Sequence, residues 1–111
     1  MKLYEIILPT CDNAGNSLDS EHREFQARVL SIVNGLTKRP EATGYWKTNG
    51  TIQTETVVAY QVACLPGQWE RIVDLAVSLF PDQKAFFTAE IGDAMIVFPD
   101  GFHAEETVAV A

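Results

Sequence analysis

Three glutamates lie within segments that the sequence predicts to be β-strands, namely Glu5, Glu55 and Glu90. The strand over residues 51–64 alternates, and Glu55 is the one charged residue on a face of otherwise small, amide and apolar side chains. A strand face in contact with water normally carries polar side chains at most positions, so this face is predicted to be covered. Because a buried unpaired charge is unstable, Glu55 is expected either to bind a ligand or to form an intersubunit hydrogen bond.

The other two strand acids are weaker candidates for a site. Glu90 shares a predicted strand face with Phe86 and Thr88, whereas Glu5 is expected to face solvent near an edge. Aromatic residues are predicted to gather near Glu55 on neighbouring strands; they are Tyr45, Trp46, Tyr60, Phe86 and Phe87. An aromatic face beside a carboxylate suits a small cation or a stacked base with a positive charge, although core packing explains the same rings.

Motifs for metal binding, phosphate binding and covalent catalysis are missing from the sequence. It has no glycine-rich phosphate loop and no visible Ser-His-Asp or Cys-His arrangement. His22 is expected in the first turn of a helix and His103 in the tail, both as solvated or capping side chains. Cys11 and Cys64 lack metal-site spacing and are expected to be reduced, small buried residues. We therefore predict no metal and no cofactor.

The composition is that of an ordinary soluble domain: 111 residues, 47% hydrophobic and 21% charged, with a formal net charge of −7. The basic residues are scattered, which argues against nucleic-acid binding. An acidic field favours a cationic ligand or a basic partner. The sequence shows no apolar signal core and no run of membrane-spanning length, so we expect a cytoplasmic protein without a membrane segment.

The hydrophobic pattern predicts alternating strands and helices. Asn49-Gly50 is a strong signal for a two-residue hairpin turn, because both positions need a positive φ. Asp19 and Ser20 are candidate N-caps of the first helix, and Trp69 lies on the apolar stripe of the second. The predicted order is strand 2–9, loop 10–20, helix 21–36, connection 37–43, strand 44–48, strand 51–64, helix 68–80, strand 84–91, strand 94–98 and tail 99–111.

This order predicts a single α+β domain over residues 1–111. The expected fold is a ferredoxin-like β-α-β-β-α-β sandwich, an antiparallel sheet with two helices on one face plus a C-terminal extension. The second sheet face would then be left uncovered, with the apolar residues Leu3, Ile7, Val57, Ala59 and Ala63 on it. An exposed apolar sheet face of this size usually marks a subunit contact. We expect closed dimers or trimers, and trimers would resemble the nitrogen-regulator (PII) architecture, whose ligand sites lie between subunits.

Four short segments carry a resemblance to a known family: Ser20-x-His22-Arg23 at the start of the first helix, the aromatic region after Gly44, Glu55-Thr56-Val57 in a strand that ends at Cys64, and residues 94–98. In these segments the sequence resembles the phage-encoded enzymes that cleave S-adenosylmethionine, which include a small enzyme known for defeating restriction. The similarity in layout spans roughly residues 4–103.

The resemblance implies a PII-like homotrimer with active sites between subunits and no cofactor. It also implies a lyase reaction, in which the substrate carboxylate attacks its own γ-carbon and releases 5′-methylthioadenosine and homoserine lactone. Glu55 would match the strand glutamate of that site, and Tyr45 would orient the substrate carboxylate. We also predict that Glu90, Tyr60, Phe87 and Thr56 bind the substrate, although Glu90 matches no residue of that family. Such a reaction needs orientation and removal of water rather than a protein nucleophile, and the sequence offers no clear nucleophile.

Three other functions stay open on the sequence alone. One is a PII-like trimer that binds a nucleotide without catalysis, although the chain lacks a basic cluster for phosphates. Another is an acidic phage protein that binds a host protein. The acids within the strands argue against this function, because they are predicted to be buried and not to form an acidic surface. The last is a dimeric ferredoxin-like barrel enzyme such as a small monooxygenase, which needs a histidine at its cleft.

Overall fold

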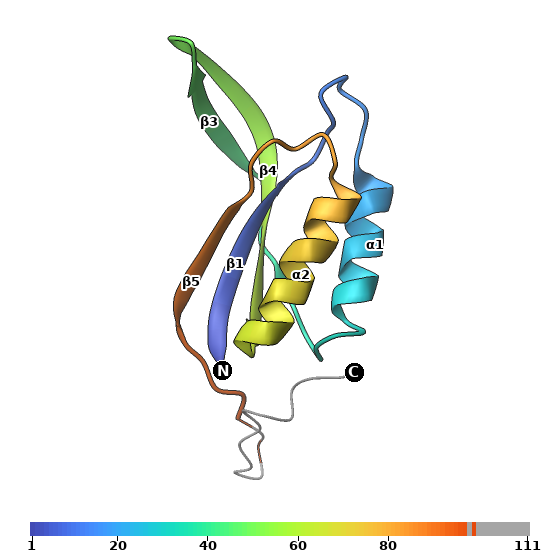
Figure 1. The fold of residues 1–111 in the computed structure, drawn as a ribbon, viewed down its shortest axis with the longest axis vertical. Helices are drawn as coiled ribbons and strands as arrows, with labels where there is room; N and C mark the ends of the chain where they lie inside the picture. Colours follow the sequence, from blue (N-terminus) through green and yellow to red (C-terminus); the bar gives the residue numbers. More distant parts are fainter. Residues whose placement is uncertain (98, 100–111) are drawn as a thin grey trace.

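The computed structural model describes residues 1–97 and residue 99. Within this part the chain forms one antiparallel sheet with two α-helices on the same face (Figure 1). The predicted α+β, ferredoxin-like plan is therefore confirmed. The elements are β1 (Lys2–Pro9), α1 (Asp19–Val29), β2 (Thr37–Lys38), β3 (Ala42–Thr48), β4 (Thr51–Cys64), α2 (Pro66–Leu79) and β5 (Phe87–Asp93).

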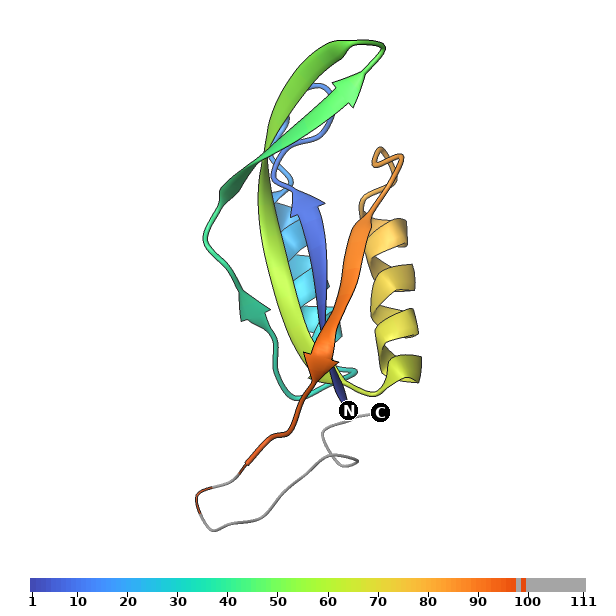
Figure 2. The same ribbon diagram turned by 90° about the vertical axis from the view of Figure 1, so that its left-hand side faces the viewer.

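Strand β4 organises the sheet because it pairs with three other strands. Its residues 57–64 pair with β1 and its residues 51–57 pair with β3, while the strand order is β2-β4-β1-β5. Since β1 ends where β3 begins to pair, the β3–β4 hairpin extends beyond the rest of the sheet (Figure 2). The predicted turn at Asn49-Gly50 is confirmed, with φ values of 51° and 80°.

The hydrophobic core lies between the sheet and the two helices. Alternate side chains of β1 and β4 point at the helices, and each helix presents an apolar stripe to them. Tyr4 of β1 stacks on Trp69 of α2 with ring centroids 4.9 Å apart, which confirms Trp69 as a packing residue. Full burial of such a side chain stabilises the fold by about 1.5–3 kcal/mol. The largest fully buried side chains are Tyr60, Phe25, Ile6, Leu8, Ile72, Val29, Val33, Val62 and Cys64.

Helix α1 is shorter than the sequence pattern predicts, because it ends at Val29 instead of residue 36. Beyond it the chain tightens, and the amides of Ser31 and Ile32 each donate to a carbonyl three residues earlier. Two consecutive β-branched residues, Ile32 and Val33, lose side-chain freedom in a helix. Here the tighter turn places both side chains in the core. The residues of the predicted apolar stripe are therefore buried, although the helix does not extend to them.

The start of α1 also differs from the prediction. Asp19 is already helical, and no side chain caps the helix, so Asp19 and Ser20 are not N-caps. The residue before the helix is Leu18, which is buried and donates its amide to the carbonyl of Thr10. An apolar anchor thus fixes the helix start where a polar cap was expected.

The C-terminal part of the described chain departs from the prediction as well. β5 starts at Phe87 and runs through Gly92 to Asp93, where a turn was predicted, with a register shift opposite Leu3 and Tyr4. Residues 94–97 form no strand, so the predicted strand 94–98 is wrong over the part that is described. The segment 37–43, predicted as a connection, contains the short strand β2. His103 and the rest of the tail from residue 100 lie outside the described residues.

The sheet face opposite the helices is uncovered within the described chain (Figure 1). Leu3, Ile7, Ala59 and Ala63 are only partly buried there, as expected for a face that a partner would cover. Val57, predicted on the same exposed face, is instead buried, with 7% exposure. Glu5 does not face solvent at an edge, because it lies on a central strand and accepts a hydrogen bond of 3.1 Å from the side chain of Gln61. None of the described helices is long and apolar enough to cross a membrane.

Candidate functional site

Glu55 lies in the β3–β4 hairpin, directly opposite Gly44. The indole Nε1 of Trp46 donates a hydrogen bond of 2.8 Å to Oε1 of Glu55. Within the part of the chain that the structure describes, Oε2 of Glu55 has no hydrogen-bond or ion-pair partner. Glu55 is half-buried and Trp46 is 41% exposed. The pair therefore fixes the carboxylate and leaves one oxygen to accept from a ligand.

Gly44 leaves the space in which this pair forms. A Cβ atom at position 44 would lie 3.6 Å from Nε1 of Trp46 and 3.7 Å from Cγ of Glu55. Both distances are ordinary contacts, so one methyl group fits, but a longer side chain would compete with the indole. The pairing register explains how Trp46 reaches Glu55, because Trp46 stands opposite Gln53 and so lies diagonally from Glu55 on the same hairpin face.

Trp46 and Glu55 line an open groove of about 460 Å³ between the hairpin and two loops. One loop is the segment after β1, and the other joins α2 to β5. We call this the hairpin groove; it is lined by Asn13, Trp46, Thr48, Gln53, Glu55, Asp82, Gln83, Lys84 and Ala85.

The hairpin groove suits a polar ligand with positive charge. It contains the carboxylates of Glu55 and Asp82 against one ammonium group, on Lys84. Carboxylate oxygens accept hydrogen bonds from hydroxyl or amino groups, and an indole face attracts a cation or a stacked base. No histidine, cysteine or serine is among its described lining residues. Across the described chain, no three His, Cys, Asp or Glu side chains gather so as to hold a metal ion.

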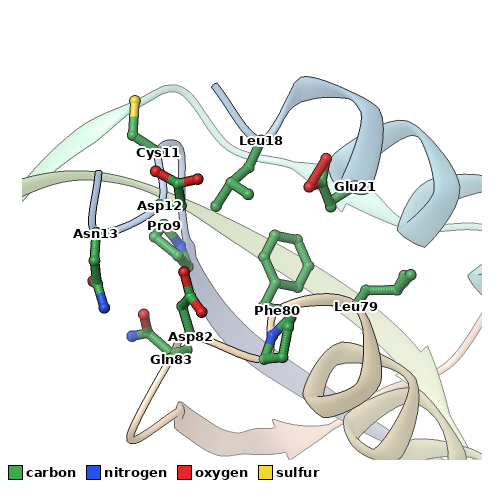
Figure 3. A pocket seen from close by; sticks show the side chains of 11 residues that line it. Pro9, Cys11, Asp12, Asn13, Leu18, Glu21, Leu79, Phe80, Asp82 and Gln83 are labelled. Carbon is green, nitrogen blue, oxygen red and sulfur yellow. The ribbon is translucent and has the colours of Figure 1, made fainter. Parts of the chain in front are cut away.

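A smaller pocket of about 120 Å³ adjoins the hairpin groove, between the loop after β1 and the end of α2 (Figure 3). Cys11, predicted to be buried, is exposed where it lines this pocket, whereas Cys64 is buried as predicted. The pocket's carboxylate from Asp12 is already engaged, since it accepts backbone amides from Ala14 at 2.9 Å and Asn16 at 2.8 Å. These bonds, first of all the one from Asn16, lower the pKa of Asp12. Asp12 therefore stabilises the conformation of the loop after β1, which also forms one side of the hairpin groove.

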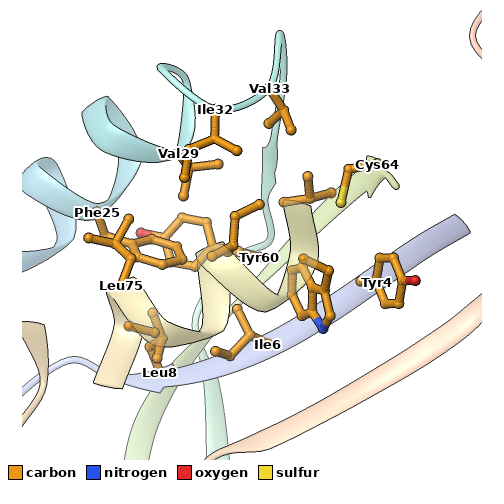
Figure 4. Packing of buried hydrophobic residues seen from close by; sticks show 14 of the residues in the cluster. Tyr4, Ile6, Leu8, Phe25, Val29, Ile32, Val33, Tyr60, Cys64 and Leu75 are labelled. Atoms are coloured by element: carbon orange, nitrogen blue, oxygen red, sulfur yellow. The ribbon is translucent and has the colours of Figure 1, made fainter. Parts of the chain in front are cut away.

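Tyr60, predicted to bind substrate, is fully buried in the core, so that prediction is wrong for a direct contact. Figure 4 shows its ring beside that of Phe25, and the two ring centroids are 5.1 Å apart. Its hydroxyl is bonded to Nδ1 of His22 at 2.8 Å and receives a hydrogen bond of 2.9 Å from Gln26. Tyr60 lies on the face of β4 that the helices cover.

His22 was expected to be solvated or capping, and the structure shows it buried, with 6% exposure. Its Nε2 lies 2.7 Å from the carbonyl oxygen of Pro9, which can only accept, so Nε2 carries the proton. Nδ1 then accepts from the hydroxyl of Tyr60. Burial lowers the pKa of His22 and raises that of Tyr60, so both stay neutral near pH 7. The sequence signal was its spacing, because residues 22, 25 and 29 form one helical stripe.

The sequence matches no protein-family model and no curated protein. Several solved structures share its arrangement of strands and helices, with identities that bear on the fold alone. The periplasmic divalent cation tolerance protein CutA from Archaeoglobus fulgidus superposes with a TM-score of 0.65 at 12% identity, over 89% of this chain and 88% of that one. The divalent cation tolerance protein from Thermus thermophilus gives 0.61 at 10%, over 84% and 85%. CutA from Xylella fastidiosa gives 0.60 at 16%, over 90% of both chains. This chain has a CutA-type fold.

Within one chain, the CutA-type fold does not bring the predicted site residues together. Tyr45 stands opposite Thr54 and is 71% exposed, so it lies on the other hairpin face from Glu55. Thr56 shares the face of Tyr45, and its carbonyl accepts from the amide and hydroxyl of Thr10. Only Glu55, among the residues predicted to be catalytic or substrate-binding, lines the hairpin groove.

The two predicted residues of β5 are also distant from Glu55. Glu90 is exposed and pairs in the sheet with Tyr4, close to the ammonium of Lys2, which lies 4.0 Å away. Tyr4 pairs in turn with Val62, seven positions along β4 from Glu55, or about 23 Å at the usual strand rise. Phe87 is 54% exposed.

Proposed function

We propose that this chain is a PII-like binding protein that holds a small, positively charged nucleoside-type ligand at the hairpin groove, between subunits of a homo-oligomer. The observation that carries the proposal is the hydrogen bond from Trp46 to Glu55. It fixes a carboxylate beside an aromatic ring in an open groove of about 460 Å³, within the usual range for ligand pockets of about 300–1,000 Å³. A cationic nucleoside uses both groups at once, through stacking and through hydrogen bonds from its hydroxyls.

The exposed apolar surface supports the oligomer. Large apolar side chains are exposed along the hairpin and β5, including Tyr45 at 71%, Ile52 at 68%, Phe87 at 54% and Ile91 at 50%. Phe87 pairs with Ile7 on the uncovered sheet face, whereas Tyr45 and Ile52 lie on the other face of the hairpin. Exposed apolar patches of this kind mark protein contacts. We propose a trimer, in which the extended hairpin of one subunit lies against its neighbour and closes the groove.

Cleavage of S-adenosylmethionine by a lyase reaction is the second candidate function. A fixed carboxylate beside an indole suits the sulfonium nucleoside, and this observation favours the candidate. An oxygen of the substrate carboxylate would bond to the γ-carbon while the carbon–sulfur bond breaks and its electron pair stays on sulfur. The products are homoserine lactone and 5′-methylthioadenosine. Two opposite charges cancel, so a closed, dry groove favours the reaction. Tyr45 of a neighbouring subunit would hold the reacting carboxylate.

One experiment tests both candidates. The purified protein is titrated with S-adenosylmethionine, with S-adenosylhomocysteine, which lacks the charge on sulfur, and with ATP, and the mixtures are separated by chromatography. We expect S-adenosylmethionine to bind most tightly, and Glu55→Gln to weaken it by about tenfold or more, the usual effect of losing a charged hydrogen bond. Glu90→Gln, which removes the carboxylate of another strand glutamate far from the groove, should leave binding unchanged.

The outcomes separate the candidates. Binding without new products supports the binding module alone, whereas methylthioadenosine and homoserine lactone in equal amounts support the lyase. If none of the three compounds binds at millimolar concentration, the proposed ligand class is wrong. If Glu55→Gln binds as well as the wild type, the hairpin groove is not the site.

A further inference from the structure

A separate hollow of about 360 Å³ lies on the helix side of the sheet, between α1 and the chain around β2. One of its walls is Val58, which points toward the helices, whereas Glu55 lies on the opposite face of β4. The hollow is therefore distinct from the hairpin groove. We call it the α1–β2 pocket; it is lined by Thr10, Asp19, His22, Arg23, Gln26, Lys38, Glu41 and Val58.

The floor of the α1–β2 pocket is held by the buried hydrogen-bond network. His22 is bonded to the carbonyl of Pro9 and to the hydroxyl of Tyr60, and Gln26 donates to the same hydroxyl. Lys38 lies opposite Tyr60 in the pairing of β2 with β4, and this pairing places its ammonium group at the rim of the pocket. Two lining residues, His22 and Gln26, are thus locked by bonds to the sheet, and the pocket has a preformed base.

The rim of the pocket carries charges of both signs. Arg23 and Lys38 supply two cations, while Asp19 and Glu41 supply two carboxylates. Asp19 and Arg23 are four residues apart on α1, a spacing at which side chains readily pair. Even so, none of these four side chains forms an ion pair or side-chain hydrogen bond within the described residues. All four charged groups are exposed and available to a ligand.

We propose that the α1–β2 pocket binds a zwitterionic ligand of the α-amino-acid class. A simple anion would be attracted by Arg23 and Lys38 but repelled by the two carboxylates. A simple cation would be attracted by the carboxylates but repelled by the two bases. A free amino acid matches both pairs, with its carboxylate toward the bases and its ammonium toward the acids. The volume of about 360 Å³ lies near the lower end of ligand pockets, which fits a molecule of this size.

Calorimetric titration with each proteinogenic amino acid at millimolar concentration tests the proposal. We expect one or a few to bind. For the tightest, both the N-acetyl derivative, which lacks the ammonium, and the methyl ester, which lacks the carboxylate, should bind at least about tenfold more weakly. Arg23→Gln and Glu41→Gln should each lower the affinity by a similar factor. Arg71→Gln and Glu70→Gln, on α2 outside the pocket, are matched controls that should change nothing.

Because all of these side chains are exposed, the variants should fold, which circular dichroism checks. No binding by any of the amino acids overturns the proposal, and so does an N-acetyl derivative that binds as tightly as its parent. Binding that survives both Arg23→Gln and Glu41→Gln places the ligand elsewhere and overturns the assignment. Glu55→Gln should leave amino-acid binding intact, so the result is independent of the function proposed for the hairpin groove.

Discussion

Removal of one hydroxyl group, by Tyr60→Phe, should destabilise the protein measurably while leaving its core filled. Tyr60 is fully buried, and its ring packs against Phe25. The substitution keeps this packing and deletes only the atom that joins His22 and Gln26. Any loss of stability therefore reports on the hydrogen-bond network between α1 and the sheet.

The size of the effect follows from the two bonds. His22 is 6% exposed, so its Nδ1 would be left buried without a donor, at a cost of about 1–3 kcal/mol. Gln26 is only partly buried and can turn to water, so its lost bond adds little. We expect the free energy of unfolding to fall by about 2 kcal/mol, a large share of the usual ~5–15 kcal/mol. The melting temperature should fall by about 8–12 °C.

Urea unfolding of the wild type, Tyr60→Phe and Tyr45→Phe measures this loss. Tyr45→Phe is the matched control, because Tyr45 is 71% exposed and its hydroxyl has no hydrogen-bond partner within the described residues. Its effect should stay within about 0.5 kcal/mol. If Tyr60→Phe is as stable as this control, the network does not hold α1 to the sheet and the reasoning is refuted.

Three further predictions concern pH, the hairpin and the thiols. The free energy of unfolding should rise as the pH approaches 6.5 from below and then level off, because burial lowers the pKa of His22 in the folded state and the unfolded chain binds more protons there. His22→Gln should flatten that rise in urea titrations. Gly44→Leu should displace Trp46 and weaken ligand binding by about tenfold, while Gly44→Ala should not, as titration calorimetry will show. In the native protein a disulfide reagent should modify Cys11 rapidly and spare Cys64, since burial raises the pKa of Cys64 to about 11; in urea both should react.

The sequence pattern predicted the layers of this fold because alternation and helical stripes report directly on which side chains are buried. The Asn49-Gly50 turn could be predicted for a local reason, since few residues adopt two consecutive positive φ values. The end of α1 could not be predicted in this way. A stripe through Ile32 and Val33 looks the same whether the backbone continues as a helix or tightens into a turn.

The candidate site was predictable only in part. Glu55 stood out as a lone charge in its strand, but its partner Trp46 depends on the hairpin register, and so does the position of Tyr45 on the opposite face. His22 was misjudged because its position in the first turn of the predicted helix suggested contact with water, while the apolar stripe that it shares with Phe25 and Val29 was the better guide. Tyr60 was predicted to bind substrate but is fully buried, because the helices cover its face of β4, and alternation alone does not say which face they cover.

The central claim is that Glu55, held by Trp46, binds a cationic nucleoside. Titration of S-adenosylmethionine into the wild type and into Glu55→Gln tests it most directly. The account predicts saturable binding to the wild type, and an affinity at least about tenfold lower for the variant, with the same unfolding midpoint in urea for both. Equal affinity of the two proteins, or no binding to the wild type, would contradict it.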